Sequence, residues 1–318
     1  MRCVPVVACL ALAACADDIG PTQPSGTERG PAEMVAASNT WISRAPLPKA
    51  RYNNRAALLN GIIYSIGGHD READTVFAYD VATNSWSRRK PLPSPREAVN
   101  GVSVIGGRLY VTGGSSPGGP MSRSLFVYTP DSDAWTRKAD MPEAGGCGAQ
   151  GVIGGMLYVY SACSGTWFFR YDPATNTWVT LRPPPTAHDF GGSGVIAGKL
   201  YLAGGGHAEN GWYVPHAQLD IYDPATDMWT AGAPMPGRAM FVASARLDGQ
   251  LFVAGGQNRS VELATLWTYD PATDVWTTRA PLPTTRTQAG GAAANGRFFV
   301  IGGKIGGTRT HKVAVYTP

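Results

Sequence analysis

Five nearly identical eight-residue segments recur along the chain at intervals of about fifty residues, and this repetition constrains the fold more than any single residue does. The segments are YDVATNSW from Tyr79, YTPDSDAW from Tyr128, YDPATNTW from Tyr171, YDPATDMW from Tyr222 and YDPATDVW from Tyr269. A repeat of roughly 20 to 50 residues is typical of arrays in which each unit is one supersecondary structure. Most of the recurring residues are therefore expected to have structural roles.

A second motif, an apolar run that ends in a glycine pair, alternates with the first. It occurs as IIYSIGG (to Gly68), RLYVTGG (to Gly114), MLYVYSA (to Ala162), KLYLAGG (to Gly205), QLFVAGG (to Gly256) and RFFVIGG (to Gly303). Tryptophans in matching positions are Trp41, Trp86, Trp135, Trp178, Trp229 and Trp276. Both sets have six members, so six units are predicted. The third unit departs from the motif, because Ala162-Cys163 replaces the glycine pair.

Each unit is predicted to contain four short strands, here called a to d in order. In the first unit, strands a, b and c are expected near residues 56–59, 62–66 and 76–79, and strand d carries Trp86. Asn60-Gly61 lies between a and b, and Asn-Gly between apolar runs indicates a tight hairpin. The 40 glycines and 25 prolines of the chain recur between such β-rich runs, so they indicate turns of an all-β domain.

The ends of the chain are out of phase with the repeat in an informative way. The residues after Trp276 supply strands a, b and c of a last unit but no strand with a tryptophan. The missing piece stands at the other end, in Asn39-Thr40-Trp41. Six complete units form only if this segment joins the last sheet, which closes a ring and removes exposed strand edges. The sequence therefore predicts a closed six-bladed β-propeller over residues 39–318.

The order of apolar run, glycine pair, spaced tyrosine and spaced tryptophan resembles the kelch repeat over about residues 39–318. The resemblance implies a binding or scaffold protein whose loop face meets a protein, a glycan or a small anionic ligand. Six-bladed bacterial kelch proteins also include sialic-acid mutarotases, which would make this chain a carbohydrate-active epimerase with Arg51, Arg96, Arg238, Arg286 and Glu209 as candidate residues. Galactose oxidase is kelch-like too, but its copper site has no counterpart in this sequence, so a copper oxidase is rejected.

Basic residues recur after the proline-rich end of strand d, where loops of a propeller surround the channel. They are Arg51, Arg96, Arg238 and Arg286, and His188 with Asp189 stands in the fourth unit. One interpretation is a cationic funnel for a carboxylate or another anion, since arginine presents paired planar donors. The other is that these side chains brace neighbouring loops.

The loop between strands b and c is longest in the fourth unit. It contains His207, Glu209, Trp212, Tyr213 and His216. Aromatic side chains on such a loop suit stacking against sugars or contact with a protein. The alternative is a loop that packs its aromatic rings down over the channel mouth.

The first fifteen residues resemble a bacterial lipoprotein signal peptide. Arg2 precedes an apolar stretch that ends in Leu12-Ala13-Ala14-Cys15, so Cys15 is the expected lipidation site. An ordinary cleaved signal is the alternative. Residues 16–38 are expected to be a flexible tether. The protein would then be exported and lipid-anchored in the bacterial cell envelope, an oxidising setting in which Cys147 and Cys163 of one blade would form a disulfide or remain buried thiols.

Several function classes have little support in the sequence. A formal net charge of +4 without a basic cluster argues against nucleic acid, and contact with a membrane is expected through the lipid anchor only. No phosphate-binding or dinucleotide motif stands in a suitable context, and the five histidines lack metal-ligand spacing, so neither cofactor nor metal is expected. The leading hypothesis is a non-enzymatic, exported kelch-repeat binding or scaffold protein. A sugar mutarotase is the alternative, and the oligomeric state is not predicted.

Overall fold

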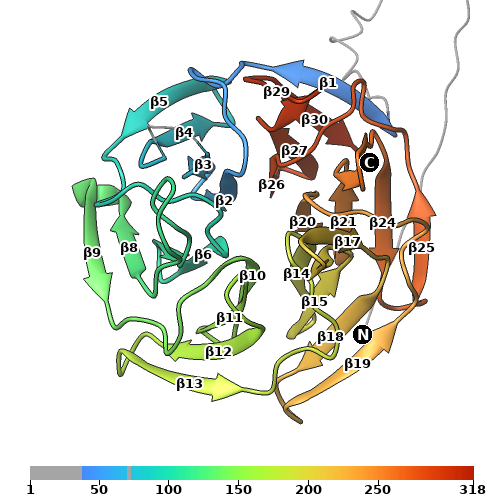
Figure 1. The fold of residues 1–318 in the computed structure, drawn as a ribbon. Coiled ribbons are helices and arrows are strands. Elements are labelled where there is room, and N and C mark those ends of the chain that lie inside the picture. Colours follow the sequence, from blue (N-terminus) through green and yellow to red (C-terminus); the bar gives the residue numbers. More distant parts are fainter. Residues whose placement is uncertain (1–37, 70–72) are drawn as a thin grey trace, which may run out of the picture. The chain divides into compact units, whose positions relative to one another are not determined.

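The computed structural model describes residues 38–69 and 73–318, which form six four-stranded antiparallel sheets arranged in a ring around a channel (Figure 1). This confirms the predicted all-β, six-bladed propeller. The expected signal peptide with Cys15, and the expected tether apart from residue 38, lie outside the described residues. Within the described part of the chain, no helix is both long enough and apolar enough to cross a membrane.

The first three blades each consist of four strands that are consecutive in sequence. Blade 1 contains β2 (Arg55–Leu59), β3 (Ile62–Ile66), β4 (Val76–Asp80) and β5 (Ser85–Arg89). Blade 2 contains β6 (Gly101–Ile105), β7 (Arg108–Thr112), β8 (Leu125–Thr129) and β9 (Ala134–Lys138), with the short 3₁₀ turn η1 (Pro130–Ser132). Blade 3 contains β10 (Gly146–Ile153), β11 (Met156–Ala162), β12 (Trp167–Asp172) and β13 (Thr177–Leu181).

The last three blades each carry a small extra hairpin in the loop between their second and third strands. Blade 4 contains β14 (Gly192–Ile196), β15 (Lys199–Ala203), β18 (Leu219–Asp223) and β19 (Met228–Gly232), with hairpin β16 (Gly206–Glu209) and β17 (Trp212–Pro215). Blade 5 contains β20 (Ala243–Leu247), β21 (Gln250–Ala254), β24 (Leu266–Asp270) and β25 (Val275–Thr278), with β22 (Gln257–Asn258) and β23 (Val261–Glu262). Blade 6 contains β26 (Gly290–Ala294), β27 (Arg297–Ile301) and β30 (Val313–Thr317), with β28 (Lys304–Ile305) and β29 (Thr308–Arg309).

The N-terminal strand β1 (Thr40–Arg44) completes blade 6, as the phase of the repeat predicts. It pairs antiparallel with β30, from Thr40 opposite Thr317 to Arg44 opposite Val313. The earliest and latest strands of the fold therefore lie side by side (Figure 1). Because β30 would otherwise be an unpaired edge strand, this pairing closes the ring and protects the edge.

The repeated tryptophans link each blade to the one before it. In every case the indole Nε1–H donates to the backbone carbonyl that follows the outer strand of the preceding blade, at 2.8 or 2.9 Å. The six bonds run from Trp86 to Ala45, Trp135 to Lys90, Trp178 to Ala139, Trp229 to Arg182, Trp276 to Ala233 and Trp41 to Ala280. The last bond crosses the closure, so all six junctions carry the same contact.

The repeated tyrosine and the Asn or Asp two residues before the tryptophan form a second recurring contact. In blade 1, the buried Tyr79 hydroxyl donates to Asn84 Oδ1 at 2.7 Å, and the same oxygen accepts the Ala45 N–H at 3.0 Å. Asn84 has φ 54°, a left-handed conformation that Asn and Asp adopt more readily than other side chains. This conformation explains why the position is Asn or Asp in all six units.

The glycine pairs let the blades approach closely at the loop end of the sheets. At Gly255, φ is +63° and a Cβ would lie 2.1 Å from the Arg286 carbonyl oxygen of the next blade. Both the backbone conformation and the lack of space therefore require glycine there. Larger apolar side chains fill the volume between neighbouring blades, as Tyr64 and Leu109 do between blades 1 and 2.

Candidate functional site

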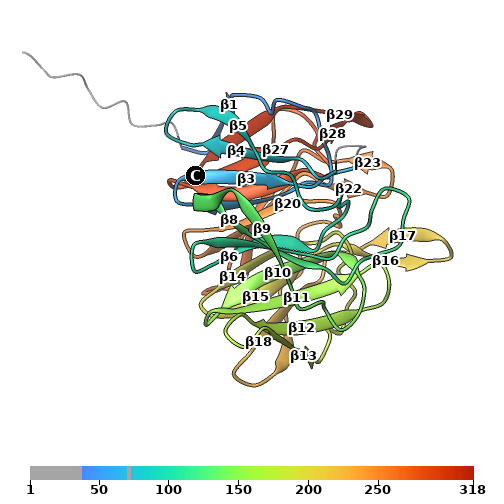
Figure 2. The same cartoon turned by 90° about the vertical axis from the view of Figure 1, so that its left-hand side faces the viewer.

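The loops that precede the first strand of each blade and the hairpins that follow the second strand emerge on the same side of the ring, here called the loop face. Figure 2 shows hairpin β16–β17 projecting from this face beyond β22–β23 and β28–β29. All nine binding residues expected from the sequence lie in these loops and hairpins. Their burial and their contacts divide them into distinct groups.

Arg51 and Arg286 are buried and hold the backbone of their own blades. The Nη1 of Arg51 donates to the carbonyls of Gly67 at 3.0 Å and Thr75 at 3.1 Å, and its guanidinium lies 4.5 Å from the Phe77 ring centre. These carbonyls stand at the end of strand b and just before strand c. The contacts are those of a brace that joins the two strands.

Arg286 occupies the same position in blade 6. Its Nη1 donates to the carbonyls of Gly302 at 2.9 Å and Lys312 at 3.3 Å. Burial lowers the pKa of Arg286 to about 10. A guanidinium that is only 3 % exposed presents little surface to a ligand from solvent.

Arg96 and Arg238 differ from this pair. Arg96 is half-buried and donates to the hydroxyls of Ser124 at 3.3 Å and Ser116 at 3.2 Å. Arg238 is exposed. The sequence pattern placed it at the position equivalent to Arg51, and the structure does not. Ala239 occupies that position, because its N–H bonds the His216 carbonyl just as the Arg286 N–H bonds that of Leu263. The loop before blade 5 has the same length as the loops that carry Arg51 and Arg286, but Arg238 stands one residue before the equivalent position.

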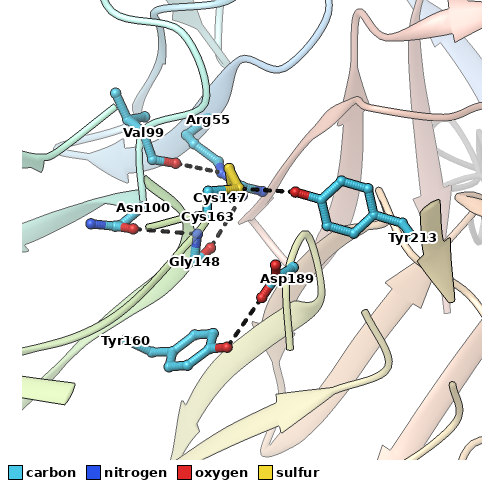
Figure 3. Close-up of a disulfide and its surroundings, with 9 residues drawn as sticks. All are labelled: Arg55, Val99, Asn100, Cys147, Gly148, Tyr160, Cys163, Asp189 and Tyr213. Carbon is cyan, nitrogen blue, oxygen red and sulfur yellow. Dashed lines mark hydrogen bonds between the residues drawn. A yellow bond between two sulfur atoms is a disulfide. The ribbon is translucent and has the colours of Figure 1, made fainter. Parts of the chain in front are cut away.

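His188 and Asp189 belong to a buried polar cluster between blades 3 and 4. The ring nitrogens of His188 lie 2.7 Å from the Gly204 carbonyl oxygen and 3.1 Å from Asp220 Oδ2. Tyr160 donates its hydroxyl to Asp189 Oδ1 at 3.4 Å, as Figure 3 shows. Burial raises the pKa of the Asp189 carboxyl to about 6, because desolvation disfavours its charged form.

His207, Glu209 and Trp212 lie together on hairpin β16–β17. Nε2 of His207 is 3.7 Å from Glu209 Oε2, and Glu209 is directly opposite Trp212 in the hairpin. The side chain of Trp212 is 79 % exposed. This exposure is the opposite of the packed-down loop that was the alternative for this segment.

A cleft of about 730 Å³ separates hairpin β16–β17 from hairpin β22–β23. Its aromatic wall consists of Trp212, Tyr213 and Phe241, and Phe241 packs against Phe190 with ring centres 4.2 Å apart and the rings tilted by 35°. Its polar side chains come from both hairpins and are Glu209, Asn210, Gln257, Arg259 and Ser260. Flat rings beside planar hydrogen-bonding groups can bind a ligand that has both apolar faces and hydroxyl groups.

A disulfide supports the aromatic wall from the side of blade 3. The structure joins Cys147 and Cys163, whose Cα atoms are 5.9 Å apart, and the Cys163 sulfur lies 3.4 Å from the Tyr213 hydroxyl. Figure 3 shows Tyr213 pointing toward this bridge. The disulfide thus gives hairpin β16–β17 a contact with the neighbouring blade.

A family model described as the kelch motif matches residues 50–93, 100–142, 190–236 and 238–283, which together make up more than half of the chain. The chain belongs to the kelch-repeat family. The third kelch unit, which lacks the glycine pair, lies outside these matches.

Curated kelch relatives match the chain over part of its length. Kelch-like protein 35 of Mus musculus is 33 % identical over 108 residues, which cover 33 % of this chain and 18 % of the relative. Beta-scruin of Limulus polyphemus is 30 % identical over 114 residues, which cover 33 % of this chain and 12 % of the relative. The alignments span a quarter or less of the length of such relatives. The solved structure of YjhT has a TM-score of 0.74 and 16 % identity, covers 86 % of this chain and 97 % of its own, and so shares the fold.

Of the nine binding residues expected from the kelch sequence, Glu209 and Trp212 line the cleft. Phe241, Gln257 and Arg259 line it as well but were not expected. Phe241 stands two residues after Ala239, the position equivalent to Arg51, and Arg259 lies in the b-to-c loop of blade 5. These residues could have been predicted from the order of the blades, since the long b-to-c loop of one blade faces the corresponding loop of the following blade.

Proposed function

We propose that this kelch propeller is a binding protein that takes a saccharide in the cleft between hairpins β16–β17 and β22–β23. The observation that carries the proposal is Trp212, a large apolar ring that is 79 % exposed at the edge of a cleft of about 730 Å³. An exposed aromatic ring beside a cleft indicates an interaction site, because its burial on binding is favourable.

The chemistry of the walls supports a saccharide in particular. The C–H face of a pyranose stacks on an aromatic ring, which Trp212 and Tyr213 offer, while its hydroxyls need planar donors and acceptors. Gln257, Arg259 and Glu209 supply these at the opposite wall and at the rim. The ligand is proposed to lie between the two hairpins.

Catalysis is the less supported alternative. A mutarotase of the kind considered from the sequence would use Glu209 together with Arg51, Arg96, Arg238 or Arg286. Glu209 lines the cleft, whereas none of these four arginines is among its lining residues. Buried Arg51 and Arg286 instead bond backbone carbonyls. We therefore propose binding without turnover.

Replacement of Trp212 by alanine is expected to weaken saccharide binding at least tenfold, which corresponds to about 1.4 kcal/mol, because the stacking platform is lost. The ligand is first selected on a glycan array and its Kd is then measured by calorimetry. Val261→Ala is the matched control, since Val261 is 63 % exposed on the same face but does not line the cleft. Equal Kd values for Trp212→Ala and the unmodified protein would refute the proposal. Anomer exchange faster than in buffer, followed by NMR, would favour the mutarotase instead.

We further propose, from the leader alone, that the protein is exported and anchored through a lipidated Cys15. The basic residue, the short apolar stretch and the small residues before Cys15 support this. Expression of the full chain in a bacterium with labelled palmitate tests it. Label in the unmodified protein that disappears in Cys15→Ser is the expected result, and equal labelling of both would contradict it.

A further inference from the structure

The central channel contains a cation that the proposed saccharide site does not use. Arg55 begins β2, the innermost strand of blade 1, and its side chain crosses the channel mouth toward the next two blades. Its Nε donates to the Val99 carbonyl at 3.3 Å and its Nη2 to the Gly148 carbonyl at 3.2 Å. Figure 3 shows this guanidinium close to Cys147 and Gly148.

The charge of Arg55 has no acidic counterpart in the channel. Among the described residues that line the channel, none is an aspartate or a glutamate. Burial alone lowers the pKa of Arg55 to about 10, with no carboxylate to raise it. Because a guanidinium remains protonated at neutral pH, the site carries a positive charge that only carbonyl dipoles offset.

One nitrogen of the guanidinium has unused hydrogen-bonding capacity. Among the described residues, Nη1 of Arg55 has no hydrogen-bond acceptor, although Nε and Nη2 both do. Gln150, another polar side chain that lines the channel, is engaged, because it bonds the Tyr110 carbonyl and the Thr112 hydroxyl. Arg55 thus has a donor, Nη1, available to a ligand in the channel.

A cavity that can hold a small ligand lies beside Arg55. The channel has a volume of about 230 Å³, and Gly101, Gly148, Gly191 and Gly291 are among its lining residues. Toward the loop face it narrows to about 10 Å³ at a neck lined by Phe190, Phe241 and Gln288 together with Arg55. Arg246, an exposed residue of β20, lines the other end. Both ends of the channel therefore carry a positive charge, which favours entry of an anion.

We propose that the central channel binds a small oxyanion, a phosphate or a carboxylate, through Arg55. One oxygen of the anion would accept from Nη1 and a second from the remaining N–H of Nη2, which matches the paired donors of a guanidinium to two oxygens on one centre. The site is separate from the saccharide cleft, whose lining residues do not include Arg55. Failure of one proposal therefore leaves the other intact.

Calorimetric titration of the full chain with inorganic phosphate, and separately with acetate, at constant ionic strength tests this proposal. Saturable binding of either anion by the unmodified protein is expected, and the arm that binds more tightly identifies the class of oxyanion. Arg55→Gln is expected to weaken that binding at least tenfold, because the charged donor is lost. Arg246→Gln is the matched control, since it removes a channel-lining cation without touching the fork, and its effect should be less than threefold.

Arg55→Lys provides a second variant in case Arg55→Gln does not fold. It keeps the charge but not the paired donors, so intermediate affinity is expected. Neither anion binding to the unmodified protein, or equal affinity in the unmodified protein and Arg55→Gln, would overturn the proposal. Loss of affinity in Arg246→Gln as large as in Arg55→Gln would overturn it too, because it would point to the net charge of the channel rather than to this side chain.

Discussion

A chain that begins at Ala45 is expected to lose at least about 3 kcal/mol of unfolding free energy relative to one that begins at Ser38. The difference between these two variants is the closing strand β1. Its loss removes the half-buried Trp41, and truncation of a packed tryptophan typically costs about 3–5 kcal/mol. It also leaves β30 without its outer partner and exposes an edge strand. Urea unfolding followed by tryptophan fluorescence measures the difference.

A milder substitution measures the hydrogen bond that closes the ring while an aromatic ring stays packed at position 41. Trp41→Phe keeps an aromatic ring against Tyr316 but removes the indole N–H that bonds the Ala280 carbonyl, so a loss of about 1 kcal/mol is expected. Trp86→Phe removes the corresponding bond to Ala45 within the continuous chain and should cost a similar amount. If the variant that begins at Ala45 unfolds at the same urea concentration as the one that begins at Ser38, the ring does not depend on β1.

The number of blades and the closure follow from patterns that are local in sequence. Tight hairpins and strand alternation involve neighbouring residues, so strand b of the first blade was predicted as residues 62–66 and is observed as Ile62–Ile66. The role of β1 follows in the same way, because a missing tryptophan strand at one end is matched by an extra one at the other. The phase of the repeat therefore determines which segments must pair.

The candidate site could not be derived in this way, because it depends on contacts between units. Hairpin β16–β17 is anchored by Gly206, whose backbone pairs with Asp189 of the preceding loop, and by the contact of Tyr213 with the disulfide. The pairing of Gly206 recurs in other blades, as between Thr287 and Lys304, so the repeat could have indicated it, whereas the contact of Tyr213 with the disulfide has no periodic signal. Arg286 is buried and Arg238 is exposed because Arg238 stands one residue before the position that Arg286 occupies, a difference that a pattern of similar positions obscures.

Arg286→Ala is expected to lower the free energy of unfolding by about 3 kcal/mol. The carbonyls of Gly302 and Lys312 would lose their donor in a buried setting, and each unsatisfied buried group typically costs about 1–3 kcal/mol. Part of this cost is offset, because the substitution also removes a charged group whose burial is itself unfavourable. Arg238→Ala should change the same quantity by less than about 0.5 kcal/mol, since Arg238 is exposed.

Measured together, urea unfolding and ligand binding distinguish a brace from an anion-binding residue at this position. A brace predicts that Arg286→Ala unfolds at a lower urea concentration while the folded protein binds saccharide and phosphate with unchanged Kd values. A funnel of arginines predicts the reverse, full stability with weakened anion binding. Because Arg286 bonds two carbonyls of its own blade and is 3 % exposed, the first outcome is expected. Unchanged stability in Arg286→Ala would show that these two hydrogen bonds contribute nothing net, and the arginines of the loop face would then have to be reassigned to ligand binding.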